Sequence, residues 1–117
     1  MKDYPYPSYL RTNRKRWALT REQLGFLLGI AAPSVVSRYE HLVRTPPAHV
    51  IIGSEFIFGE HARQIFPGLY SSIEQNVMGR AALLAERIGE RDDKAAKTIG
   101  ELLDNIASRA ASDALHV

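Results

Sequence analysis

The stretch LRTNRKRWALTREQLGFLLGIAAPSVVSRYEHLVRTPP, residues 10–47, decides the fold of this 117-residue chain. Thr20 followed three residues later by Gln23 is a capping box, so a helix is predicted to start there and to end near Gly29. Pro33 suits the first turn of the next helix, where a missing N–H costs nothing. The stretch therefore predicts two short helices joined by a tight turn, the second running to about residue 41.

Further helices are predicted on both sides of this pair. Upstream, Ser8 can cap a helix that runs to about Trp17, and downstream Pro47 can open a helix that Gly59 ends. A short turn follows and closes at Pro67-Gly68. No strand-type alternation of useful length appears anywhere in the chain. The predicted fold class is therefore all-α.

After this point the sequence carries a long apolar stripe, which the polar run ERDDK at residues 90–94 interrupts. Asp93 can cap a last helix beyond the interruption. Stripes with near-heptad spacing are typical of helix–helix surfaces. The stripe is predicted to be a dimerisation or partner surface, and its members are Ile73, Val77, Leu84, Ile88, Ile99, Leu102, Leu103 and Ile106.

The chain is predicted to have an N-terminal and a C-terminal part, and the two halves of the sequence also differ in net charge. We expect an N-terminal arm at residues 1–7, a folded domain at 8–68 and a C-terminal helical extension at 69–117. Residues 1–50 carry eight basic and three acidic side chains, whereas residues 51–117 carry seven and ten. The basic half predicts a surface for a polyanion.

Composition excludes several other classes of protein. The chain has no cysteine, so a disulfide scaffold, a thiolate zinc site and a cysteine nucleophile are excluded. Its longest apolar stretch, residues 50–58, is too short to span a bilayer, and its first residues have no apolar signal core. We therefore expect a cytoplasmic protein.

The two central helices meet the demands of a helix-turn-helix DNA reader. The first helix needs an apolar face, which Leu24, Leu27 and Leu28 supply, and Gly29 tolerates the dihedral angles of the turn. The second helix needs one face for the core and one for base edges. Its core face is predicted to be Val36 and Tyr39, and its free face Ser34, Ser37, Arg38 and His41.

These residues resemble the Xre/Cro/CI-type helix-turn-helix family of bacterial and phage regulators. The resemblance covers residues 8–66, and it implies a five-helix, lambda-repressor-like domain that binds double-stranded DNA. Seven residues separate Gly29 from Ser37 where the family usually has six, and His41-Leu42 stand where it often has glycine. The matching points are Leu10, Arg14, Leu19-Thr20, Glu22, Leu24, Leu27, Gly29-Ile30, Val36-Ser37-Arg38-Tyr39-Glu40 and Pro46.

Roles toward DNA follow from side-chain chemistry. Arg38 can reach a guanine in the major groove, a contact worth about 1–3 kcal/mol of discrimination. Base readout is expected from Ser34, Val35, Ser37 and Arg38. Phosphate contacts are expected from Arg11, Thr20, Arg21, Gln23 and Arg44.

The resemblance also implies one structural ion pair. In this family a basic residue at the end of the first helix commonly pairs with the glutamate that ends the third. By that resemblance Arg14 and Glu40 form a partly buried pair that holds one helix against the other.

The aromatic side chains at helical spacing are expected to be core residues rather than stacking platforms for bases. This expectation covers Trp17, Phe26, Phe56, Phe58 and Phe66.

The sequence thus predicts a dimeric, sequence-specific transcriptional repressor of bacterial or phage type that binds double-stranded DNA. No cofactor, metal or catalytic activity is expected, because the four histidines lack metal-ligand spacing and no phosphate loop or nucleophile elbow appears. The alternative is a protein-partner module, an antitoxin or anti-activator. Its C-terminal helices would bind another protein, and its DNA binding would be secondary or lost.

Overall fold

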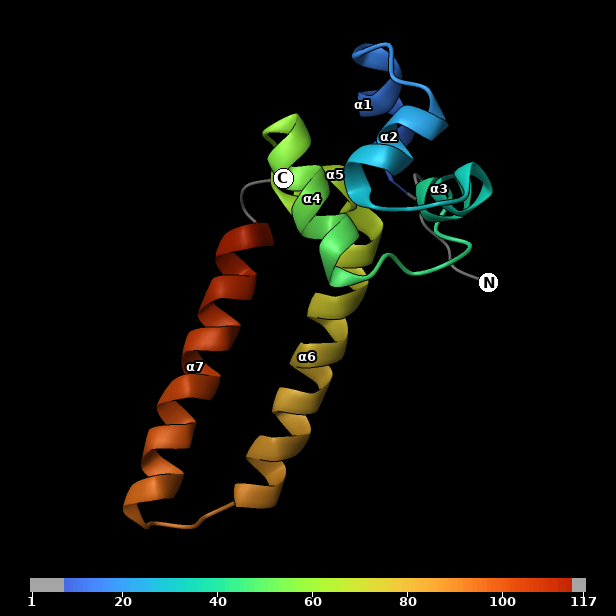
Figure 1. Cartoon of the computed structure of the whole chain (residues 1–117). Coiled ribbons are helices and arrows are strands. Elements are labelled where there is room, and N and C mark those ends of the chain that lie inside the picture. The colour runs from blue at the N-terminus through green and yellow to red at the C-terminus, as the bar shows by residue number, and fades with distance from the viewer. Residues whose placement is uncertain (1–7, 115–117) are drawn as a thin grey trace. The chain divides into compact units, whose positions relative to one another are not determined.

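The computed structural model describes residues 8–114, and the expected N-terminal arm lies outside them. The described part is all-α, as predicted (Figure 1). The chain divides between Ser71 and Ser72 into two compact units, each of which is described by itself below. The helices are α1 (Leu10–Arg16), α2 (Arg21–Leu28), α3 (Pro33–Glu40), α4 (Ala48–Phe58), α5 (Ala62–Ile65), α6 (Pro67–Ile88) and α7 (Lys94–Ala114).

Local hydrogen bonds set the start and the end of α2 as the sequence predicted. The Thr20 Oγ1 accepts the Gln23 N–H at 3.0 Å, and the Gln23 Oε1 accepts the Thr20 N–H at 2.9 Å. Gly29 ends the helix with a φ of 75°, in the left-handed region that glycine adopts without a Cβ clash. The predicted capping box and glycine stop are both confirmed.

We expect Thr20→Ala to lower the free energy of unfolding by about 1 kcal/mol, because the Gln23 backbone N–H at the start of α2 loses its side-chain acceptor. Urea denaturation measures the change. The control is Thr12→Ala, an exposed position in α1 where alanine is a better helix former. A loss of similar size in both variants would contradict the capping role.

Ser8 does not cap α1 in the predicted way. The N-cap residue is Tyr9, whose side chain makes no capping bond. The Ser8 hydroxyl instead donates to the Glu40 carbonyl oxygen at 2.7 Å and accepts the Leu10 N–H at 3.4 Å. The Ser8 hydroxyl thus donates its hydrogen bond to the backbone carbonyl of Glu40, at the end of α3, instead of capping α1.

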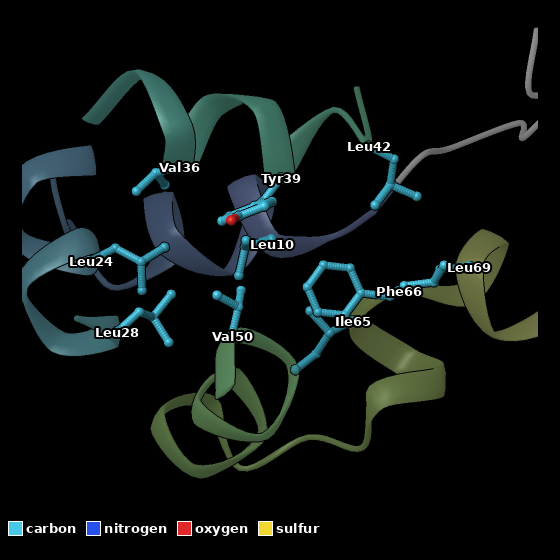
Figure 2. Close-up of a cluster of buried hydrophobic side chains, with 10 residues drawn as sticks. All are labelled: Leu10, Leu24, Leu28, Val36, Tyr39, Leu42, Val50, Ile65, Phe66 and Leu69. Carbon is cyan, nitrogen blue, oxygen red and sulfur yellow. The ribbon is translucent and has the colours of Figure 1, made fainter. Parts of the chain in front are cut away.

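The hydrophobic core of the first unit gathers side chains from all its helices (Figure 2). Two glycines let these helices approach closely. A Cβ on Gly25 of α2 would stand 3.0 Å from the Ile30 carbonyl oxygen and 3.2 Å from the Val36 Cγ2, which brings α3 against α2. A Cβ on Gly53 of α4 would stand 2.7 Å from the Leu28 Cδ2. The buried apolar cluster comprises Leu10, Leu24, Leu28, Val36, Tyr39, Leu42, Val50, Ile65, Phe66 and Leu69.

Several apolar side chains that the sequence assigned to the core are exposed. Phe26 is 84% and Phe56 91% exposed, and Trp17 and Leu27 are exposed by more than half. Phe26 stands two residues from each of Leu24 and Leu28, on the opposite side of α2, so docking of the leucines turns it outward. The core prediction holds for Phe66, which is buried, and partly for Phe58.

Pro67-Gly68 begins a helix rather than closing a turn. Pro67 is the first residue of α6, a position where proline is well tolerated. Gly68 and Leu69 are buried in the first unit, so the boundary expected at residue 68 lies inside α6. The helix then continues into the second unit.

The second unit consists of the rest of α6, a loop at residues 89–93, and α7, which runs back in the opposite direction (Figure 1). In the loop, Arg91 donates from Nε and Nη2 to the two carboxylate oxygens of Asp93, at 3.1 and 3.0 Å. The Arg91 guanidinium lowers the pKa of this carboxyl group. None of the described helices is long and apolar enough to cross a membrane.

Candidate nucleic-acid interface

The face of α3 that points away from the core is polar. Val36 and Tyr39 are buried in the core, so Ser34 and Arg38 point away from it and are exposed. Ser37 lies between them and is half-buried. Among the described residues, no carboxylate forms an ion pair with Arg38. The guanidinium of Arg38 therefore has its five donors available for an external acceptor.

Val35 does not share this free face. It is half-buried and packs against the core. Base readout by Val35 was predicted because an apolar side chain can meet a thymine methyl group, but its side chain already has partners inside the protein. The other three expected base-reading residues keep surface exposure.

The start of α3 is defined by an extended residue and a proline. Ala32 is the N-cap with φ −109° and ψ 123°, and Pro33 is the first helical residue. The Ile30 N–H donates to the Gly25 carbonyl oxygen at 2.7 Å, which closes the turn onto α2. Residues 29–32 thus connect the two helices, and the longer spacing between Gly29 and Ser37 is accommodated here.

The end of α3 adopts a conformation that usually calls for glycine. Leu42 has a φ of 51°, and it follows the residue that caps α3. Its side chain is buried in the core, so apolar burial offsets the backbone strain at this position. This is where the sequence departs from the glycine of the family it resembles.

Glu40 is the buried centre of a charged network. Its Oε2 accepts a hydrogen bond from the Arg14 Nε at 2.6 Å, and the two side chains are 0% and 8% exposed. The Arg14 Nη1 also donates to the Leu19 carbonyl oxygen at 2.9 Å. The ion pair implied by the resemblance is present, and it ties α1 to α3.

A second arginine on the same carboxylate was not foreseen from the sequence. The Arg21 Nε lies 3.4 Å from the Glu40 Oε1, and the Arg21 side chain is 42% exposed. One buried carboxylate therefore faces two arginines. The sequence offered no signal for this contact, because it depends on how the first turn of α2 docks against the end of α3.

The expected phosphate-binding residues lie on three different segments. Thr20, Arg21 and Gln23 form the start of α2, while Arg11 is exposed on α1 and Arg44 is exposed after α3. The amide oxygen of Gln23 is engaged in the cap, so its NH₂ group is what this side chain can offer to a phosphate. Arg21 offers the part of its guanidinium that Glu40 does not hold.

The apolar surface predicted for the C-terminal helices separates into two sets. Ile88 on α6 and Ile99, Leu103 and Ile106 on α7 are partly buried. The other set is about half exposed and comprises Ile73, Val77, Leu84 and Leu102.

Metal binding has no support in the described part of the chain. No group of three or more histidine, aspartate or glutamate side chains there is placed to hold a metal ion.

Neither a protein-family model, nor a curated protein, nor a solved structure matches this chain in sequence or fold comparisons. The assignment of a function therefore depends on the residues and contacts described above.

Proposed function

We propose that this protein is a sequence-specific transcriptional regulator that binds double-stranded DNA and represses by occupying a promoter. In this proposal α2 and α3 are the helix-turn-helix of a lambda-repressor-like domain, and α3 is the recognition helix. The observation that supports it best is the free face of α3. Ser34, Ser37 and Arg38 stand there on a helix whose opposite face is anchored in the core.

The proposed binding mode places α3 in the major groove. The Arg38 guanidinium would donate to the O6 and N7 of a guanine, and the two serine hydroxyls would donate to or accept from base edges or phosphates. The start of α2 would lie at the DNA backbone, where its N–H groups and the Arg21 side chain favour a phosphate. The Glu40 network would keep the spacing between these two contacts constant.

We expect two copies on each operator. A single module of this size reads a half-site, and dimeric readers place two recognition helices about one DNA turn apart. The expected operator is therefore two-fold symmetric.

Selection from a random duplex DNA library at moderate salt tests the proposal. We expect an enriched two-fold symmetric site for the wild-type protein, and for Arg38→Ala at the same protein concentration a site that has lost its preference at one base pair of each half-site. Binding that depends on salt but enriches no sequence would overturn the proposal.

Removal of a phosphate contact should change the salt dependence without changing the selected sequence. We expect Arg44→Ala and Arg11→Ala each to reduce the slope of log K against log salt by about 2, because each of the two copies on the operator releases one fewer counterion. Titrations of the selected duplex at several salt concentrations measure the slope. Lys94→Ala, an exposed lysine in α7, is the control and should leave it unchanged.

A second candidate function, a protein-partner module, is favoured by the half-exposed apolar side chains of the C-terminal helices. Purification together with the product of an adjacent gene, in a complex that survives gel filtration, would support this candidate. Without a selected DNA site, it would replace the first proposal.

A further inference from the structure

The two C-terminal helices each carry an inner row of side chains with low exposure. On α6 this row contains Glu74, Met78, Ala81 and Ile88, and on α7 it contains Ala96, Ile99, Leu103, Ile106 and Ala110. The spacings are three, four or seven residues, as expected for one face of each helix. We call these positions the seam of the hairpin.

A second row lies beside the seam on each helix. Its members stand one residue before a seam residue, except Leu84, which continues the row four residues after Arg80 and three before Arg87. In a pair of antiparallel helices that face each other, such positions lie on the same side of the pair, because reversing the chain direction also reverses the sense of winding seen from one end. The two rows therefore lie on the same side of the antiparallel pair, and we call them together the arginine face. It comprises Ile73, Val77, Arg80, Leu84 and Arg87 on α6, and Ala95, Thr98, Leu102, Asn105 and Arg109 on α7.

The apolar members of the arginine face lack a cover within the second unit. Ile73, Val77, Leu84 and Leu102 are 42 to 52% exposed, although they follow a regular helical spacing. The second unit consists of two helices and a loop, and the burial that its seam provides leaves this side open. A further helix laid along the face would bury these four side chains.

The charges of this face all have the same sign. Arg80, Arg87 and Arg109 lie on it, and between residues 73 and 109 it contains no aspartate or glutamate. No ion pair joins any of the three arginines to a carboxylate among the described residues. Between residues 73 and 109, Glu86 and Asp104 belong to the opposite side of the helices, since Asp104 follows the seam residue Leu103 and Glu86 precedes the seam residue Ile88 by two.

We infer that the arginine face binds an acidic amphipathic helix of a partner protein. The apolar side of that helix would cover Ile73, Val77, Leu84 and Leu102, and its flanking aspartates and glutamates would meet the arginines, whose planar guanidinium groups bind carboxylates in a bidentate manner. The inference does not rest on DNA binding.

The positive charge of the arginine face also argues against a second copy of this chain as its binding partner. Two arginine faces packed on each other would bring three arginines of one copy against three of the other, with no acidic side chain to pair with them. Like charges at such a contact oppose association. A dimer on DNA would then form through another surface.

Selection from a displayed library of helical peptides tests the inference on the full-length chain. The library has leucine at the positions of one helical face and random residues at the flanking positions. We expect the wild-type protein to enrich aspartate and glutamate at the flanking positions, and Arg80→Glu/Arg87→Glu to enrich lysine and arginine. The double variant should also bind the wild-type-selected peptide at least about tenfold more weakly, the sum of two exposed charge pairs.

The matched control is Lys94→Glu/Lys97→Glu, which makes the same change in net charge at exposed positions outside the face. It should select the same acidic peptides as the wild type. No enrichment, or equal loss of binding in the control, would overturn the inference. A wild-type dimer that Leu84→Glu dissociates in sedimentation would also overturn it, because the face would then hold a second copy.

Discussion

Glu40→Ala is expected to lower the free energy of unfolding by about 3–5 kcal/mol, because it leaves the buried Arg14 guanidinium without its counter-charge. Arg14 is 8% exposed on its side chain, so water cannot replace the carboxylate. Arg21, which is partly exposed, can turn to solvent and adds little to the loss. For a domain of this size the melting temperature should fall by at least about 10 °C.

The same change should weaken DNA binding, because Glu40 holds the start of α2 and the end of α3 together. Calorimetry of Glu40→Ala and of Glu22→Ala, an exposed glutamate of α2 without an ion pair among the described residues, separates the buried pair from a general effect of charge. An unchanged melting temperature in Glu40→Ala would disprove the structural role of the pair. The double change Arg14→Leu/Glu40→Leu should recover part of the loss, since it leaves no lone buried charge.

Arg38→Ala is expected to remove about 1–3 kcal/mol of discrimination at one base position, or roughly 5-fold to 150-fold in relative affinity. The Arg38 side chain is exposed and makes no ion pair with the described residues, so the melting temperature should stay the same. This combination of lost specificity and unchanged stability differs from the result expected for Glu40→Ala, which loses stability.

Competition between the selected duplex and duplexes with single base-pair changes measures the effect of Arg38. The wild type should reject a change at one guanine more strongly than Arg38→Ala does. Arg16→Ala, an exposed basic residue of α1, is the control and should weaken all duplexes to the same small extent. If Arg38→Ala also weakened every duplex equally, Arg38 would be a phosphate contact and another residue would read the base.

The fold class and the bounds of α2 could be read from short-range patterns. The reciprocal bonds between Thr20 and Gln23 join residues three apart, and the left-handed Gly29 needs only its missing Cβ. The all-α class follows from the absence of period-two alternation. Each of these features depends on interactions among a few neighbouring residues, so it can be predicted without knowledge of the tertiary structure.

The candidate site was predicted in part. Ser34, Ser37 and Arg38 keep surface exposure because Val36 and Tyr39 occupy the opposite face of α3, which helical spacing alone implies. Val35 packs against the core instead. Its burial depends on how closely α3 docks against the other helices, which the spacing of residues within α3 does not reveal.

By itself, then, the sequence determined the all-α class, the start and the end of α2, the free face of α3 and the uneven charge of the two halves. Only the tertiary structure decided which apolar side chains are buried, as the exposed Phe26 and Phe56 show, and that one carboxylate faces two arginines. It also divided the C-terminal stripe into a seam and an open face. The physical reason is that helix starts arise from hydrogen bonds over three or four residues, whereas burial and ion pairs arise from the docking of segments far apart in the chain.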